Sequence, residues 1–86
     1  MHYIYILSLG NNSLYKGRTD NIKRRVSEHQ AGKVEATKYK LPARLIHFEC
    51  YVVKSDCIRR EKYLKTTEGR RFLKQQLRDL FKKIVG

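Results

Sequence analysis

Apolar residues recur along the chain in two kinds of pattern, one typical of strands and one typical of helices. The segments Tyr3–Leu9 and Leu14–Thr19 are rich in β-branched and aromatic side chains and predict two strands. Gly10–Ser13 between them has the composition of a tight turn. Ala43–Val53 predicts a third strand, and its dense apolar content favours a central or well-covered position in the sheet.

The loop length of this hairpin decides whether two tyrosines, Tyr5 and Tyr15, can act together. A loop of three or five residues puts them on the same face of the sheet, whereas a loop of two or four puts them on opposite faces. We predict a three-residue loop at Asn11–Ser13, and therefore two tyrosines on one face.

A first helix is predicted within Asp20–Ala31, capped by Thr19 or Asp20 and ended by Gly32. Its inward stripe, read at helical spacing, is Ile22, Arg25, Val26 and His29. An ordinary amphipathic helix would have apolar residues where Arg25 and His29 stand. They lie either in a functional site or on the border of the stripe, with packed stems and solvated heads.

A second helix is predicted from a cap at Ser55 or Asp56 to about Lys65, with Glu61 in the middle of its inward face. Burial of a lone carboxylate is costly unless it meets a cation, hydrogen bonds or a metal. An internal salt bridge, with Arg25 as the first candidate, is the alternative to a functional role.

The longest predicted helix is Thr67–Val85, with an uninterrupted apolar stripe that covers the core, whereas Gln75 lies on the solvated side. The order β-β-α-β-α-α implies an α/β (α+β) fold in which three helices flank a small, largely antiparallel sheet of three strands. The apolar stripe of the helix predicted at Thr67–Val85 consists of Phe72, Leu73, Leu77, Leu80, Phe81 and Ile84.

Composition bounds the class of protein. At 86 residues the chain is predicted to form one domain, residues 1–86. Two cysteines are too few for a disulfide framework, and no apolar run fits a signal peptide or a membrane span. We therefore expect a cytoplasmic protein, with no membrane partner, that is a monomer. Twenty Lys and Arg against eight Asp and Glu give a net charge of +12, which favours nucleic acid as the partner.

The series Tyr5, Tyr15-Lys16-Gly17, Arg25, His29 and Glu61 resembles the GIY-YIG nuclease family. The chain is most similar to the small single-domain endonucleases of that family, which are related to the nuclease module of an excinuclease. Tyr3-Ile4-Tyr5 stands where the family has Gly-Ile-Tyr, and Tyr15-Lys16-Gly17 where it has Tyr-Ile-Gly. Gln75 stands where many active members have asparagine. The resemblance covers nearly the whole chain.

The resemblance implies a metal-dependent endonuclease that hydrolyses phosphodiester bonds, with DNA as the expected substrate. Tyr5 and Tyr15 would activate water, because a cationic neighbourhood favours phenolate, and His29 would relay the proton. Arg25 would hold a phosphate oxygen. Glu61 would bind one Mg²⁺ or Mn²⁺ ion, which needs only one or two protein carboxylates.

Further residues are expected to contact the nucleic acid. Lys38 and Tyr39 lie in the loop Gly32–Pro42, where basic and aromatic residues alternate as they do on nucleic-acid-binding surfaces. Gly17 would allow close approach of the backbone. The expected set is completed by Arg18 and Gln75. The competing hypothesis is a non-catalytic binding module that keeps the nuclease fold: Gln75 favours it and Glu61 opposes it.

Overall fold

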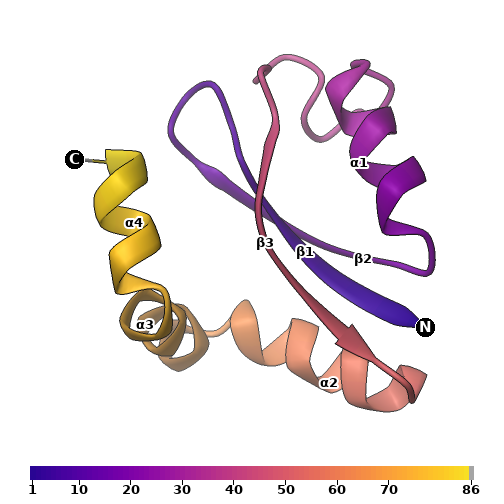
Figure 1. Cartoon of the computed structure of the whole chain (residues 1–86), viewed down its shortest axis with the longest axis vertical. Coiled ribbons are helices and arrows are strands. Elements are labelled where there is room, and N and C mark those ends of the chain that lie inside the picture. The colour runs from indigo at the N-terminus through magenta and orange to yellow at the C-terminus, as the bar shows by residue number, and fades with distance from the viewer. Residues whose placement is uncertain (86) are drawn as a thin grey trace.

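The computed structural model describes residues 1–85 as a three-stranded antiparallel sheet with four helices (Figure 1). The α+β architecture and the order of the strands confirm the sequence prediction, except that the last predicted helix is divided in two. Among residues 1–85, no helix has both the length and the apolar character needed to cross a membrane. The elements in order are β1 His2–Ser8, β2 Leu14–Thr19, α1 Ile22–Gln30, β3 Arg44–Tyr51, α2 Lys54–Leu64, α3 Thr67–Gln76 and α4 Arg78–Val85.

Strand β1 is the centre of the sheet, in the order β2-β1-β3. Its four residues from Ile4 to Leu7 are buried, because helices or loops cover both of its faces. The prediction that the third strand is central or well covered is wrong. Strand β3 is an edge strand, and its Phe48 is half-exposed. A dense apolar composition therefore did not distinguish the edge strand from the central one.

The β1–β2 hairpin has the predicted parity but a different loop. Leu7 lies opposite Tyr15 and Ser8 opposite Leu14, so residues 9–13 connect the strands. The expected loop at Asn11–Ser13 is wrong, because Leu14 pairs with Ser8 and not with Gly10. A hydrogen bond of 2.9 Å from the Leu9 N–H to the Ser13 carbonyl closes the base of the observed loop. Asn12, with φ of 66°, supplies the left-handed residue of the turn. Because the parity is retained, the two tyrosines lie on the same face.

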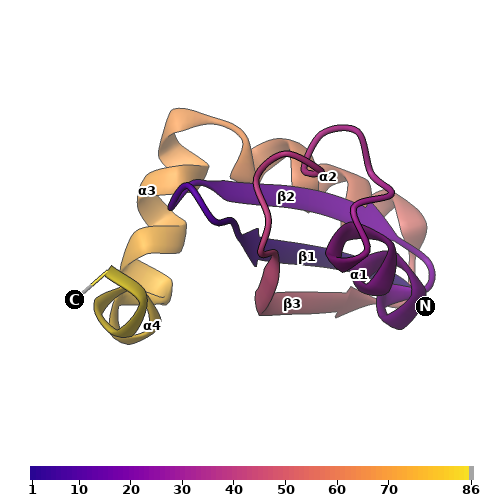
Figure 2. The same ribbon diagram turned by 90° about the horizontal axis from the view of Figure 1, so that it is seen from above.

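The sheet separates two apolar clusters, one against α1 and one against α2 and α3. Figure 2 shows α1 in front of the sheet and α2 behind it. The first cluster contains Tyr5, Leu7, Leu9 and Ala43, with Ile22 and Val26 of α1 packed against them. The second contains Ile4, Ile6, Cys57, Leu64 and Leu73. Alternate residues of β1 thus point into different layers.

The helix starts differ from the predicted caps. Asn21, rather than Thr19 or Asp20, caps α1: its side-chain oxygen accepts from the Arg24 N–H at 3.1 Å. The first residue before α2 is Val53, which makes no side-chain cap, so neither Ser55 nor Asp56 caps that helix. Gly32, with φ of 74°, follows the end of α1 as predicted.

The predicted helix Thr67–Val85 breaks at Leu77, between α3 and α4. Leu73 belongs to the apolar cluster between the sheet and α2 and α3, and Leu77 packs against it. The apolar stripe of α4 instead faces the β1–β2 turn, where Phe81 and Ile84 line a hollow together with Leu14. The chain changes direction between α3 and α4, so that α4 runs beside the β1–β2 turn, as Figure 1 shows.

Candidate active site

Tyr5 and Tyr15 occupy neighbouring strands on the face that α1 covers. Their ring centroids are 6.2 Å apart. Tyr5 is almost completely buried, whereas Tyr15 is half-buried and so stands nearer to solvent. The hairpin register therefore produces a pair with one inner and one outer phenol.

His29, in the last turn of α1, joins the inner phenol to the loop that follows the helix. Its Nε2 lies 2.8 Å from the Tyr5 hydroxyl, and its Nδ1 lies 2.7 Å from the Thr37 hydroxyl. The imidazole is fully buried, and its centroid is 4.9 Å from that of the Tyr15 ring. Of the two interpretations of His29, the border position with a solvated head is therefore wrong.

Burial sets the protonation states of this pair. It raises the pKa of Tyr5 above its ordinary value, and the opposing interaction with Arg25 is too weak to reverse the shift. Burial also lowers the pKa of His29, and the positive charge of Arg25 lowers it further. Contrary to the expectation from the sequence, Arg25 alone therefore does not favour the phenolate of Tyr5. At neutral pH the pair consists of a neutral phenol and a neutral imidazole, which can exchange a proton.

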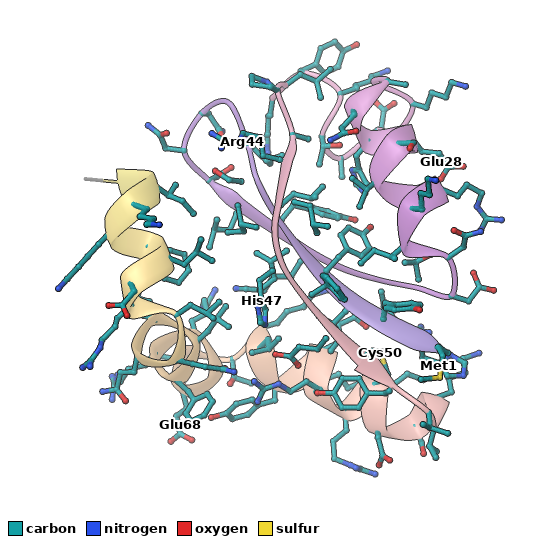
Figure 3. The ribbon with its side chains drawn as sticks, viewed as in Figure 1. Met1, Glu28, Arg44, His47, Cys50 and Glu68 are labelled. Carbon is teal, nitrogen blue, oxygen red and sulfur yellow. The ribbon has the colours of Figure 1, made fainter. Side chains whose placement is uncertain are left out.

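Arg25 lies one turn before His29 and connects the buried pair to the surface. Its Nη1 donates to Glu28 at 3.1 Å, and its side chain is 37% exposed. Interaction with Tyr5, and then with Glu28, raises the pKa of the guanidinium. Glu28 is labelled on α1 in Figure 3. Since Arg25 touches both the phenol and the surface, it is placed to meet an anion.

A polar cleft of about 500 Å³ opens beside Arg25. Its cations outnumber its carboxylates, and both carboxylates are already paired, Asp20 with Arg24 and Glu28 with Arg25. The cleft is therefore suited to a phosphate group. Its lining consists of His2, Arg18, Thr19, Asp20, Arg24, Arg25, Glu28 and Lys54.

Glu61, on α2, lies across the sheet from the tyrosine pair. Its carboxylate accepts from Arg18 Nε at 3.3 Å and from Lys65 Nζ at 3.5 Å, and the side chain is 19% exposed. Arg18 pairs in register with Ile4, which belongs to the layer of α2. The salt-bridge partner expected from the sequence, Arg25, is therefore wrong, and the partner is Arg18.

The five residues that the resemblance implies for catalysis do not line one pocket, and Tyr15 is half-buried on the face of α1. Tyr5 and His29 are buried, Arg25 lines the cleft, and Glu61 lies on the opposite face. Arg18 connects the last two, because it lines the cleft and also contacts Glu61.

A metal at Glu61 would have a single protein carboxylate. Within residues 1–85 no three His, Cys, Asp or Glu side chains are grouped as metal ligands. Mg²⁺ fits such a donor, because it retains several waters and takes the remaining oxygens from the substrate. The contact of Lys65 with Glu61 is long and that lysine is 57% exposed, so one carboxylate oxygen can be released. The residues present fit one hydrated divalent ion.

Gly17 lies directly opposite Tyr5 in the hairpin. A Cβ at Gly17 would collide with the Tyr5 hydroxyl, so only glycine leaves room for the buried phenol. The group that approaches Gly17 closely in this structure is the Tyr5 phenol. The predicted loop at Asn11–Ser13 would pair Gly17 with Leu7 instead, so this contact depends on the register that the structure shows.

Of the remaining predicted contacts, Tyr39 and Gln75 are exposed and Lys38 is partly buried. Tyr39 is 85% exposed, and the Lys38 ammonium lies 4.9 Å from its ring centroid. Lys38 also pairs with Glu35 at 2.8 Å. Gln75 is an exposed residue of α3.

Two residues near the site, Glu28 and Thr37, were not predicted from the sequence. Glu28 stands three residues after Arg25, and this spacing on a helix is a sufficient signal for an ion pair. Thr37 lies in the loop after α1, where no periodicity shows which side chains are buried, yet it is fully buried.

Known proteins are similar to this chain in sequence and in fold. The chain matches the GIY-YIG catalytic domain over residues 1–76. A UPF0213 protein of Haloquadratum walsbyi is 40% identical over 77 residues, which cover 88% of this chain and 84% of that protein. One of Staphylococcus haemolyticus is 40% identical over 74 residues, which cover 85% of this chain and 90% of that protein. The solution NMR structure of a UPF0213 protein from Bacillus halodurans superposes with a TM-score of 0.57 at 29% identity, covering 87% of this chain and 83% of that chain.

Proposed function

The chain belongs to the GIY-YIG nuclease family, and from this premise we propose that it is a metal-dependent endonuclease that hydrolyses phosphodiester bonds, with DNA as the expected substrate. The observation that carries the proposal is the buried 2.8 Å contact between Tyr5 and His29 beside Arg25. A module that only binds phosphate has no need of a buried phenol–imidazole pair, because binding requires no proton transfer.

The attacking water would stand beside the outer phenol. Tyr15 orients this water, and the Tyr5 oxygen accepts its proton as the Tyr5 hydrogen moves to Nε2 of His29, which becomes an imidazolium. This relay needs a neutral phenol and a neutral imidazole, which is the state that burial favours. Tyr5 therefore acts by passing a proton, without first becoming a phenolate.

Charge on the phosphate would be met from the cleft. Arg25 donates through its planar guanidinium to a non-bridging oxygen, and Arg18 and Lys54 add positive charge. Glu61 would hold one Mg²⁺ or Mn²⁺ ion once Lys65 releases an oxygen. Such an ion, when bound, neutralises charge on the phosphoryl and leaving oxygens.

The alternative function is a non-catalytic nucleic-acid-binding module. The observation that favours it is the pairing of Glu61 with two cations, Arg18 and Lys65, which satisfies the carboxylate without a metal. The same basic cleft would then hold phosphate without cutting it. The two functions differ in cleavage and not in binding.

The test is a cleavage and binding assay on single-stranded, duplex, nicked and branched DNA and on RNA, with Mg²⁺, Mn²⁺ or a chelator. We expect Tyr5→Phe to lower cleavage at least about a hundredfold, the usual effect of losing acid–base catalysis, with unchanged affinity for nucleic acid. Tyr51→Phe is the matched control, because it removes a phenol bonded to Glu49 at 2.8 Å outside the site. Binding without cleavage of any substrate by the unaltered protein would support the module, and full activity of Tyr5→Phe would overturn the proposed relay.

A further inference from the structure

Thr37 is a buried polar residue in a surface loop, and the proposed proton relay does not by itself account for it. It is fully buried, and its hydroxyl lies 2.7 Å from Nδ1 of His29. Buried hydroxyls are retained where they have a hydrogen-bonding role, since burial without a partner is costly. The role of this hydroxyl depends on which nitrogen of His29 carries the proton.

The proposed relay fixes that assignment. Arg25 can only donate, and it interacts with the Tyr5 phenol, which leaves the phenol hydrogen for another acceptor. The contact of 2.8 Å between the phenol and Nε2 of His29 permits donation in either direction. The relay requires that the phenol donates to Nε2, which is then the unprotonated nitrogen. A neutral imidazole carries one N–H, so that hydrogen lies on Nδ1 and needs an acceptor.

We infer that Thr37 is a positioning residue: its hydroxyl accepts from Nδ1–H of His29 and so holds the imidazole in the tautomer whose Nε2 can take the proton of Tyr5. A threonine oxygen has two lone pairs, so the Thr37 hydroxyl can accept this hydrogen bond without another group. The inference deepens the proposed nuclease function and rests on it for the catalytic consequence. Its structural part, the tautomer of His29, is tested by a measurement that needs no cleavage.

The loop is built to keep Thr37 in place. The Thr37 N–H donates to the Val34 carbonyl at 3.1 Å, and the Lys40 N–H donates to the Thr37 carbonyl at 2.9 Å. Val34 is itself buried, and the Gly10 N–H of the hairpin turn donates to the Lys40 carbonyl at 2.7 Å. The backbone on both sides of Thr37 is thus anchored, and the hydroxyl has a fixed position.

The first experiment is NMR of the histidine ring nitrogens in the full chain. We expect the unaltered protein to show His29 with its hydrogen on Nδ1. In Thr37→Val, which has nearly the same shape but no hydroxyl, we expect a shift toward the Nε2–H form. Thr37→Ser should restore the Nδ1–H form, and Thr67→Val, at an exposed threonine of α3, should leave it unchanged. An Nε2–H tautomer in the unaltered protein overturns the inference, even if Thr37→Val fails to fold.

The second experiment measures cleavage kinetics of the same variants. We expect Thr37→Val to lower kcat at least about tenfold, as expected when a general base is held in the wrong tautomer, with KM unchanged. Thr37→Ser should recover most of the rate. Equal kcat in Thr37→Val and the unaltered protein, with the tautomer shifted, would overturn the positioning role. If the unaltered protein cuts no substrate, the nuclease proposal fails, while the NMR result still decides the tautomer.

Discussion

Glu61→Gln separates a metal-binding carboxylate from a structural one. The substitution retains the size of the side chain and removes one negative charge. Glu61 is 19% exposed, its partner Arg18 is 34% exposed, and its partner Lys65 is 57% exposed, at contact distances of 3.3 and 3.5 Å. Ion pairs of this kind contribute about 0–1 kcal/mol. For a domain of this size, the melting temperature should therefore fall by no more than about 8 °C.

The effect on cleavage should be much larger. A catalytic metal supplies several kcal/mol of stabilisation to the transition state, so loss of its carboxylate should lower the rate by at least about a hundredfold. Affinity for nucleic acid should be equal or slightly higher, because the negative charge near Arg18 has gone. Thermal melts in metal-free buffer, cleavage rates and binding titrations are measured together. Glu68→Gln, at an exposed glutamate of α3, is the matched control.

Two results would refute this reasoning about Glu61. Cleavage by Glu61→Gln at the rate of the unaltered protein would show that the carboxylate holds no catalytic metal. A loss of about 3–5 kcal/mol, the cost of breaking a fully buried pair, would show that the contacts with Arg18 and Lys65 are structural. Neither result would change the assignment of Tyr5 and His29, which lie on the other face.

Two further predictions concern phosphate binding and acid stability. Arg25→Ala should weaken binding of nucleic acid and lower the salt dependence of affinity by about one phosphate contact. Arg59→Ala removes a matched helical ion pair at an exposed site and should change neither quantity. Equal salt dependence in both variants would contradict a phosphate role for Arg25. Burial raises the pKa of Glu49, but hydrogen bonds, first from Arg60, outweigh this effect and hold the pKa below 4.5. The carboxylate therefore contributes its full stabilisation above pH 4.5, and this stabilisation is lost as the pH falls through the pKa of the folded state. Melts down to about pH 3 should show a shallower acid decline for Glu49→Gln than for the unaltered protein; parallel declines would exclude this role.

The Glu49 cluster also explains how the edge strand is attached. Glu49 of β3 accepts from Arg60 of α2 at 3.0 and 3.3 Å and from Tyr51 at 2.8 Å. His47 points from β3 toward α2, as Figure 3 shows, and its Nε2 lies 3.1 Å from Glu49. These residues were not predicted from the sequence, because their meeting depends on which helix covers β3.

Local periodicity determined the parts of the site that depend on one element or one hairpin. The parity of the hairpin put Tyr5 and Tyr15 on one face, and the spacing of Arg25 and His29 put both on the inward side of α1. These predictions were confirmed because side-chain direction repeats every two residues in a strand and about every 3.6 in a helix, whatever the element packs against. The order of strands and helices followed for the same reason.

Contacts between elements were decided only by the tertiary structure. Periodicity placed Glu61 on the inward face of its helix. The packing of α2 against β2 determines that its partner is Arg18. Periodicity gave an apolar stripe that continues past Leu77, but it did not show the break between α3 and α4 at that residue. It gave no sign that Thr37 is buried, because a loop has no repeat and its burial depends on the helix it follows. Each of these outcomes depends on which surfaces meet in space, and a linear pattern of polar and apolar residues records only the surfaces themselves.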